Sequence, residues 1–282
     1  MIKAILRGGI VMTNLLLQFA VASATDAPTR HLVDAGVARI DVIAEGRGPL
    51  IVLIPSTGRG SSDFDVLAVE LANEGYRVLR PQPRGIDGSV GPMEGVSFHD
   101  FANDIASVIR DEGGGPAVVA GHAYGNWIAR TVAADHPELV RGLVLIAPGA
   151  KKWPRELSDA IMTINDASAP TSMRLKALEL AFFAPGNDAS SWLEGWHARV
   201  TESQRVARQN TQTDSWWTAG KAPILELQAE NDPFRPPGTT DELAKELGDR
   251  VAVVVVPNAS HALPAEKPAA VVQAISAWMR KL

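Results

Sequence analysis

The pentapeptide at residues 121–125, Gly-His-Ala-Tyr-Gly, constrains the fold more than any other part of the chain. It follows a short apolar run of strand type at residues 116–120 and precedes residues 126–134, which have the apolar spacing of a buried helix. Glycines on both sides of a central residue are typical of a strained turn that leaves no room for neighbouring side chains. We therefore expect a strand, a sharp turn and a helix in direct succession.

Length and composition indicate one enzyme-sized domain. The chain has 282 residues, 46% of them hydrophobic, so it can bury a large core without dividing in two. A formal net charge of −5 gives no electrostatic basis for binding nucleic acid. The absence of cysteine excludes disulfides, thiolate metal sites and a cysteine nucleophile.

The N-terminus has the outline of a secretory signal peptide. Lys3 and Arg7 precede an apolar stretch at residues 9–20, and Ala22-Ser23-Ala24 resembles a cleavage site. The stretch is too short and too polar for a membrane span, so we expect no stable membrane insertion. The protein is expected to be periplasmic or secreted if residues 1–24 are a signal peptide, and cytoplasmic otherwise.

From residue 37 onward, strand-like apolar runs alternate with helical patterns. Strands are expected at residues 37–43, 50–54, 76–79, 118–120, 143–146, 224–227 and 251–256. Helices are expected at residues 62–74, 98–112, 126–135, 239–247 and 269–279. This alternation predicts an α/β fold, with a mostly parallel sheet covered by helices on both faces. In such sheets, ligands bind beyond the carboxyl ends of the strands.

Residues 149–220 break the alternation, because they contain helical patterns at residues 171–183 and 193–208 but no strand pattern. Five of the seven tryptophans lie in this insertion: Trp153, Trp192, Trp196, Trp216 and Trp217. We expect a helical cap whose tryptophans together form an apolar pocket wall. The alternative for any single tryptophan is that it only packs within the insertion. The expected boundaries are an N-terminal apolar segment at residues 1–30, a core at 31–148 and 221–282, and the cap at 149–220.

Three positions give the chain its resemblance to a known family. The pentapeptide resembles the nucleophile elbow Gly-x-Ser-x-Gly, with Ala123 in the place of the serine. Asp232 follows the strand at residues 224–227 and His261 follows the strand at 251–256, which is the family's chain order of nucleophile, acid and histidine. On these motifs the chain resembles the α/β-hydrolase-fold superfamily, of the capped serine esterase or lactonase type.

The resemblance implies a catalytic triad at Ala123, Asp232 and His261. In such a triad the histidine accepts the serine proton, and the carboxylate holds the histidine in the required tautomer. Two alternatives remain open: Asp232 as a solvated turn residue with Glu230 in its place, and His261 as a surface histidine. A methyl group cannot attack a carbonyl, so the chain with Ala123 should lack the family's usual nucleophile.

The family's oxyanion hole consists of two backbone N–H groups. The resemblance assigns one to Tyr124. The other belongs to the loop at residues 55–60, where Thr57 aligns best and Ser56 next. This loop reads Pro-Ser-Thr-Gly-Arg-Gly and departs from the family's usual His-Gly, which leaves the second donor open between these two residues.

The expected activity is therefore hydrolysis of a small carboxylic ester or lactone with apolar or aromatic groups, without metal or organic cofactor. Ala123 has three explanations: replacement of a natural serine, natural loss of catalysis in a ligand-binding protein, or a cofactor-independent oxygenase-like member that uses the His–Asp pair as base. The sequence does not fix the oligomeric state.

Overall fold

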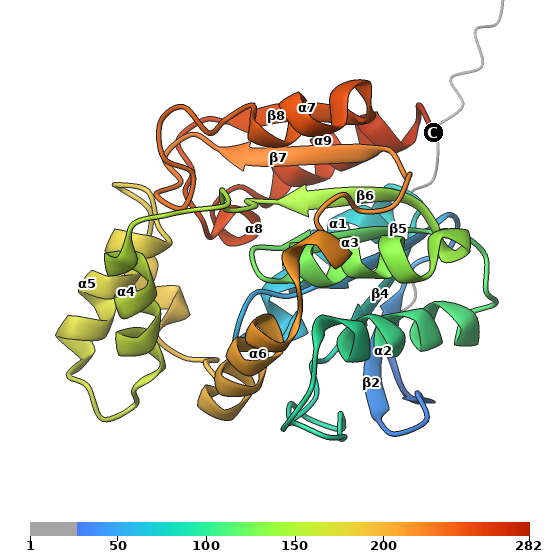
Figure 1. Cartoon of the computed structure of the whole chain (residues 1–282), viewed down its shortest axis with the longest axis horizontal. Coiled ribbons are helices and arrows are strands. Elements are labelled where there is room, and N and C mark those ends of the chain that lie inside the picture. The colour runs from blue at the N-terminus through green and yellow to red at the C-terminus, as the bar shows by residue number, and fades with distance from the viewer. Residues whose placement is uncertain (1–26) are drawn as a thin grey trace, which may run out of the picture.

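The computed structural model of the chain describes residues 27–282, so the expected signal peptide lies outside the described residues (Figure 1). Eight strands form one sheet in the order β1-β2-β4-β3-β5-β6-β7-β8. β2 pairs antiparallel with β1 and with β4, whereas the remaining neighbours all run parallel. This arrangement confirms the predicted α/β fold class. Among residues 27–282, no helix has both the length and the apolar character needed to cross a membrane.

Seven of the strands correspond to predicted ones, with some ends shifted by a few residues. The strands are β1 (Thr29–Asp34), β2 (Arg39–Glu45), β3 (Leu50–Ile54), β4 (Arg77–Pro81), β5 (Ala117–His122), β6 (Val140–Ile146), β7 (Ile224–Ala229) and β8 (Val251–Val256). The sequence does not predict β1, because this edge strand is polar and buries only Val33. Its start at Thr29 also places the beginning of the sheet before the expected boundary at residue 31.

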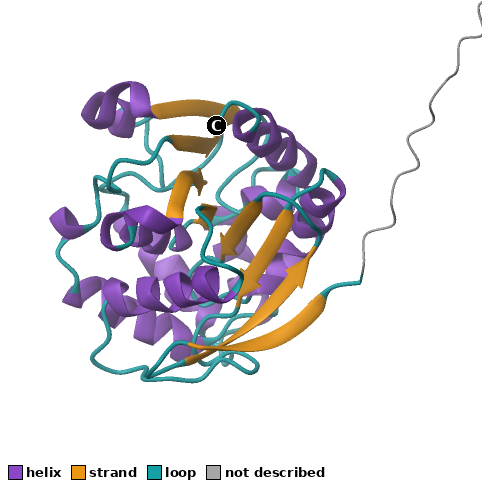
Figure 2. Ribbon diagram, turned by 90° about the vertical axis from the view of Figure 1, so that its right-hand side faces the viewer, coloured by secondary structure: helices purple, strands orange, loops and turns teal. Residues whose placement is uncertain are grey.

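Six helices accompany the sheet and three belong to the insertion. The first group comprises α1 (Asp65–Asn73), α2 (Phe98–Asp111), α3 (Gly125–Asp135), α7 (Glu242–Leu247), α8 (Leu263–Glu266) and α9 (Pro268–Met279). The second comprises α4 (Arg155–Asn165), α5 (Thr171–Ala181) and α6 (Ala198–Asn210). Figure 2 shows helices on both sides of the twisted sheet. α4 and α5 lie beyond the arrowheads of β6 and β7 (Figure 1).

Two hydrophobic cores occupy the two faces of the sheet. Along β3, Val52 and Ile54 point into the core shared with α2 and α3, whereas Ile51 and Leu53 point into the core shared with α1 and α9. Successive side chains of a strand alternate between faces, so a strand buried on both sides must be apolar throughout. This explains why the central strands read as continuous apolar runs.

β8 differs from the central strands, because within residues 27–282 it is the last strand of the sheet and pairs with a neighbour on one side only. Its valines at 253, 254 and 255 are 38%, 39% and 49% exposed although the strand is apolar throughout. The edge strand β8 is thus less covered than the central strands of the sheet. An apolar run predicts a strand, but it does not predict whether that strand lies at the edge or in the centre of the sheet.

Candidate active site

β5 passes into α3 through a turn with Ala123 at its tip. The φ angle of Ala123 is +48°, in the left-handed region that costs about 1–2 kcal/mol for a residue other than glycine. A Cβ atom at Gly121 would lie 2.2 Å from the carbonyl oxygen of Gly125, and a Cβ at Gly125 would lie 2.3 Å from that of Ile54. Both flanking positions therefore require glycine, as the sequence motif predicts.

His261 and Asp232 form a buried pair close to this turn. The Nδ1 atom of His261 lies 2.8 Å from Oδ2 of Asp232, and each residue is only 6% exposed. The other carboxylate oxygen of Asp232 accepts a hydrogen bond of 2.9 Å from the backbone N–H of Phe234. In neutral His261 this contact places the proton on Nδ1 and leaves the lone pair of Nε2 available.

Glu230, the alternative acid, has a different partner. Its Oε2 atom accepts a hydrogen bond of 3.0 Å from the backbone N–H of Asn258, and its side chain is exposed. The structure thus brings Asp232, and not Glu230, into contact with His261.

A cavity of about 260 Å³ lies beside the elbow and is lined by several of the other predicted positions. Six of the predicted site residues line it: Ser56, Thr57, Ala123, Tyr124, Trp153 and His261. Asp232 lies behind the ring of His261 and does not line the cavity. Within residues 27–282, no three His, Asp or Glu side chains come together as metal ligands do.

The other four predicted tryptophans pack elsewhere. Trp192 and Trp196 lie against the guanidinium of Arg59, at 4.4 and 4.9 Å from ring centroid to Cζ. Trp216 and Trp217 are part of the core beside α2 and α3. Trp192 and Trp196 pack within the insertion, whereas Trp216 and Trp217 also line a neighbouring cavity together with Trp127 and Trp153.

Trp127 lines the cavity although the sequence analysis does not select it. Its ring stacks on that of Trp153, with centroids 6.1 Å apart and planes 16° apart. Trp127 follows Ala123 by about one helical turn, which places both on the same side of the start of α3. This spacing is the signal that identifies Trp127.

Gln204 of α6 holds the loop that follows β3. Its side-chain oxygen accepts hydrogen bonds from the backbone N–H of Gly58 (2.8 Å) and from the hydroxyl of Thr57 (3.1 Å). Its backbone carbonyl accepts one from the hydroxyl of Tyr124 (3.2 Å). Among the described residues, nothing accepts from the backbone N–H of Ser56, Thr57 or Tyr124, which all line the cavity. These N–H groups are therefore available to a ligand oxygen.

His122 is a structural histidine beside the elbow. Burial lowers its pKa to about 3, so its ring is neutral at ordinary pH. Its Nε2–H donates a hydrogen bond of 2.6 Å to the backbone carbonyl of His261. His122 thereby fixes the loop that carries the histidine paired with Asp232.

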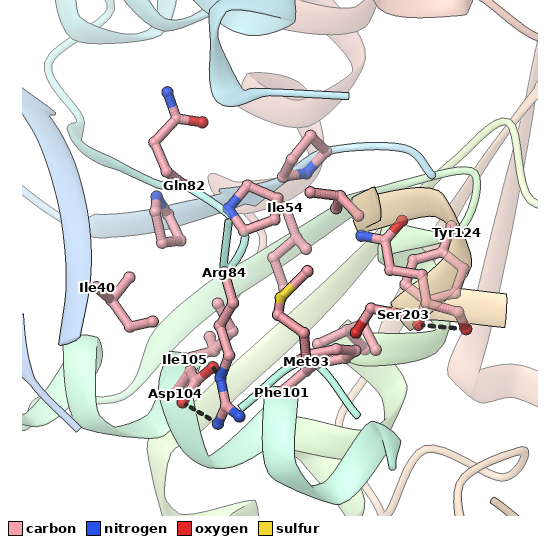
Figure 3. Close-up of a pocket in the computed structure, with 16 residues that line it drawn as sticks. Ile40, Ile54, Gln82, Arg84, Met93, Phe101, Asp104, Ile105, Tyr124 and Ser203 are labelled. Carbon is pink, nitrogen blue, oxygen red and sulfur yellow. Dashed lines mark hydrogen bonds and ion pairs between the residues drawn. The ribbon is translucent and has the colours of Figure 1, made fainter. Parts of the chain in front are cut away.

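A smaller cavity of about 50 Å³ adjoins the first and shares Tyr124 and Gln204 with it (Figure 3). One wall carries a buried ion pair, in which Nε of Arg84 lies 2.7 Å from Oδ2 of Asp104. Burial raises the pKa of Asp104, an effect that the Arg84 guanidinium partly offsets. The remaining lining is mainly apolar, so this cavity extends the apolar surroundings of the elbow.

A model of the alpha/beta hydrolase family matches residues 51–274. The chain belongs to the alpha/beta hydrolase family. Two curated relatives of this alpha/beta hydrolase are 32% identical to it. They are 2-(acetamidomethylene)succinate hydrolase of Mesorhizobium japonicum, over 46% of each chain, and epoxide hydrolase A of Mycobacterium tuberculosis, over 42% of this chain and 38% of the relative. The matches therefore span less than half the length of these relatives.

Solved structures resemble this alpha/beta hydrolase over most of its length. The crystal structure of E-2-(acetamidomethylene)succinate hydrolase has a TM-score of 0.75 at 22% identity, covering 90% of this chain and all of that one. A thermophilic esterase from Thermogutta terrifontis has a TM-score of 0.73 at 22% identity, covering 91% of this chain and 99% of that one. At this level of identity the likeness shows the shared fold.

The glycine requirement at the elbow gives a first prediction. Gly125→Ala should lower the free energy of unfolding by about 3 kcal/mol or more, because the new methyl group meets the carbonyl oxygen of Ile54. Gly115→Ala is the matched control, since a Cβ there meets no atom within 4 Å. Urea unfolding of both variants measures the difference, and equal stability would contradict the close packing of the turn.

The buried His122 gives a second prediction, on pH. Its folded-state pKa of about 3 lies below the unfolded value of about 6.5, so the unfolded chain binds the extra proton between these values. The contribution of His122 to the free energy of unfolding is therefore fully present above about pH 6.5. It decreases as the pH falls toward 3. From pH 7.5 to 5.5, the parent protein should lose about 1 kcal/mol more than His122→Gln in urea unfolding. Equal losses would mean that His122 is protonated within the fold.

Proposed function

We propose that this alpha/beta hydrolase is built to cleave carboxylic esters or lactones by a Ser-His-Asp mechanism, and that Ala123 stands where the serine belongs. One arrangement supports the proposal: the strained tip at Ala123 and the buried His261–Asp232 pair meet at a single cavity. As it stands, the chain would bind such a substrate without forming an acyl-enzyme.

The roles follow from the geometry. In the Ala123→Ser form, Nε2 of His261 takes the hydroxyl proton while the oxygen attacks the substrate carbonyl. The backbone N–H groups of Tyr124 and Thr57 would bind the negative charge on the carbonyl oxygen, with Ser56 as the alternative second donor. His261 then gives the proton to the leaving alcohol, and a water molecule repeats the sequence to release the acid. Asp232 keeps His261 oriented throughout.

The surroundings of Ala123 favour replacement of a serine over long-standing loss of catalysis. The left-handed backbone at Ala123 costs stability, and an alanine has no proton for the buried His261–Asp232 pair to accept. The second candidate, a natural ligand-binding protein, is favoured only by the alanine itself. A third, base catalysis by the His–Asp pair as in cofactor-independent oxygenases, needs no serine.

We further propose that residues 149–220 act as the cap of this site, between core segments at residues 31–148 and 221–282. Trp153 and α4 contribute to the lining of the cavity, as do Gln204 and other residues of α6. Since the cap supplies much of the wall, it would determine which esters or lactones are accepted.

The proposal predicts that Ala123→Ser gains esterase activity that the parent chain lacks. Loss of a triad member typically costs on the order of a million-fold in turnover, so the contrast should be large. Hydrolysis of 4-nitrophenyl acetate, 4-nitrophenyl butyrate and simple lactones by both forms measures it, with Ala123→Gly as the control for a changed turn. Absence of any gain would favour the ligand-binding alternative.

The assignment of the acid predicts a second contrast in the Ala123→Ser background. Asp232→Asn should lower turnover by about ten-thousand-fold, because the amide no longer holds His261 in the reactive tautomer. Glu230→Gln is the matched control and should have little effect, since Glu230 bonds to Asn258 instead. The reverse order of the two effects in steady-state kinetics would move the acid to Glu230.

A further inference from the structure

Arg208 of α6 stands at the wall of the cavity beside the elbow. It also lines a neighbouring cavity of about 280 Å³, which shares Trp127 and Trp153 with the first. The guanidinium carbon lies 4.7 Å from the ring centroid of Trp127 and 4.8 Å from that of Trp153. The two indoles therefore hold the cation in place through ring contacts.

Among the described residues, no carboxylate forms an ion pair with Arg208, and its guanidinium makes ring contacts rather than hydrogen bonds. Burial lowers the pKa of Arg208, an effect that Tyr124 partly offsets. A guanidinium presents a planar fork of N–H donors that matches a carboxylate, and ring contacts leave those donors unused. Such a group on a cavity wall is suited to an anionic ligand.

The two other cations that line these cavities already have carboxylate partners. Arg205 lines the same cavity but donates to Glu202 at 2.8 and 2.6 Å. Lys151 lines the neighbouring cavity and is paired with Glu246. Asp159 also lines the first cavity, but its side chain is 70% exposed, so water screens its repulsion of an anion.

We propose that the substrate of this site carries a carboxylate in addition to its ester or lactone group, and that Arg208 binds this carboxylate. The proposal rests on the hydrolase function proposed above. The ester carbonyl would lie at Ala123, the carboxylate at Arg208 and the apolar part of the substrate against Trp127 and Trp153. The preferred class is thus a monoester of a dicarboxylic acid that carries an aromatic substituent, or a lactone bearing a free acid.

The parent chain with Ala123 tests this by binding alone. Monomethyl 3-phenylglutarate carries one carboxylate, and dimethyl 3-phenylglutarate is its neutral counterpart of nearly the same size. Isothermal titration calorimetry at low salt should show at least about tenfold tighter binding of the monoanion, because charge-assisted pairing with a guanidinium is strong in a partly desolvated site. Raising the salt concentration to about 1 M should weaken binding of the monoanion only.

Arg208→Gln should remove the preference for the monoanion while leaving the affinity for the neutral diester within a few-fold. Arg199→Gln is the matched control, because Arg199 is an exposed residue of the same helix that lines neither cavity. Arg208→Lys keeps the charge without the planar fork, and should retain a reduced preference of several-fold. This second variant serves if Arg208→Gln does not fold.

Equal affinity for the two esters, including no measurable binding of either, would overturn the proposal. A preference that survives in Arg208→Gln, or that disappears in Arg205→Gln instead, would do the same. Hydrolysis by the Ala123→Ser form separates the two proposals. If that form cleaves neutral esters and the parent chain shows no anion preference, only the role of Arg208 fails. If the preference depends on Arg208 and no ester is cleaved, the anion site stands and the hydrolase function fails.

Discussion

The close approach of the β5–α3 turn to the end of β3 is the contact on which the site depends. Gly125 leaves no space between its own backbone and the carbonyl oxygen of Ile54, so the start of α3 lies directly against the loop that follows β3. The backbone N–H of Tyr124 and those of Ser56 and Thr57 consequently border one cavity. A single steric constraint thus brings together two segments that are distant in the sequence.

The insertion completes the site by bracing this loop from the other side. Its backbone bonds to the loop where the N–H of His197 donates to the carbonyl of Gly58 at 2.9 Å. Arg59 of the loop donates to the carbonyl of Glu194 at 2.5 Å and to the carboxylate of Asp63 at 2.6 and 2.9 Å. Together with the bonds of Gln204, these contacts couple the position of the proposed oxyanion donors to the fold of the insertion.

Sequence patterns predict those parts of this architecture that depend on local constraints. The elbow could be found because only glycine tolerates its crowded flanks, and the strands because a sheet buried on both faces requires continuous apolar runs. The order of motifs placed Asp232 and His261 after the correct strands, where the structure pairs them.

Features that depend on packing between segments distant in the chain could not be predicted from the sequence. The polar edge strand β1 lacks an apolar signal, since its partner β2 supplies most of its stabilising contacts through the backbone. Composition places Trp192 in the predicted insertion but does not indicate whether its ring faces a cavity or packs against neighbouring side chains. The contacts of Gln204 and Arg208 join α6 to segments far away in the chain, and no local pattern encodes them.

The two edges of the sheet are protected by different means. β1 carries charged and polar side chains, which discourage pairing with a strand of another molecule. β8 offers a free backbone edge and partly exposed valines, the combination that favours intermolecular strand pairing and aggregation. Asp249 and Arg250 precede it and Pro257 follows it, in the manner of gatekeeper residues around an aggregation-prone segment. These three flanking residues and the shortness of the six-residue strand counter the intermolecular pairing that this edge would otherwise favour.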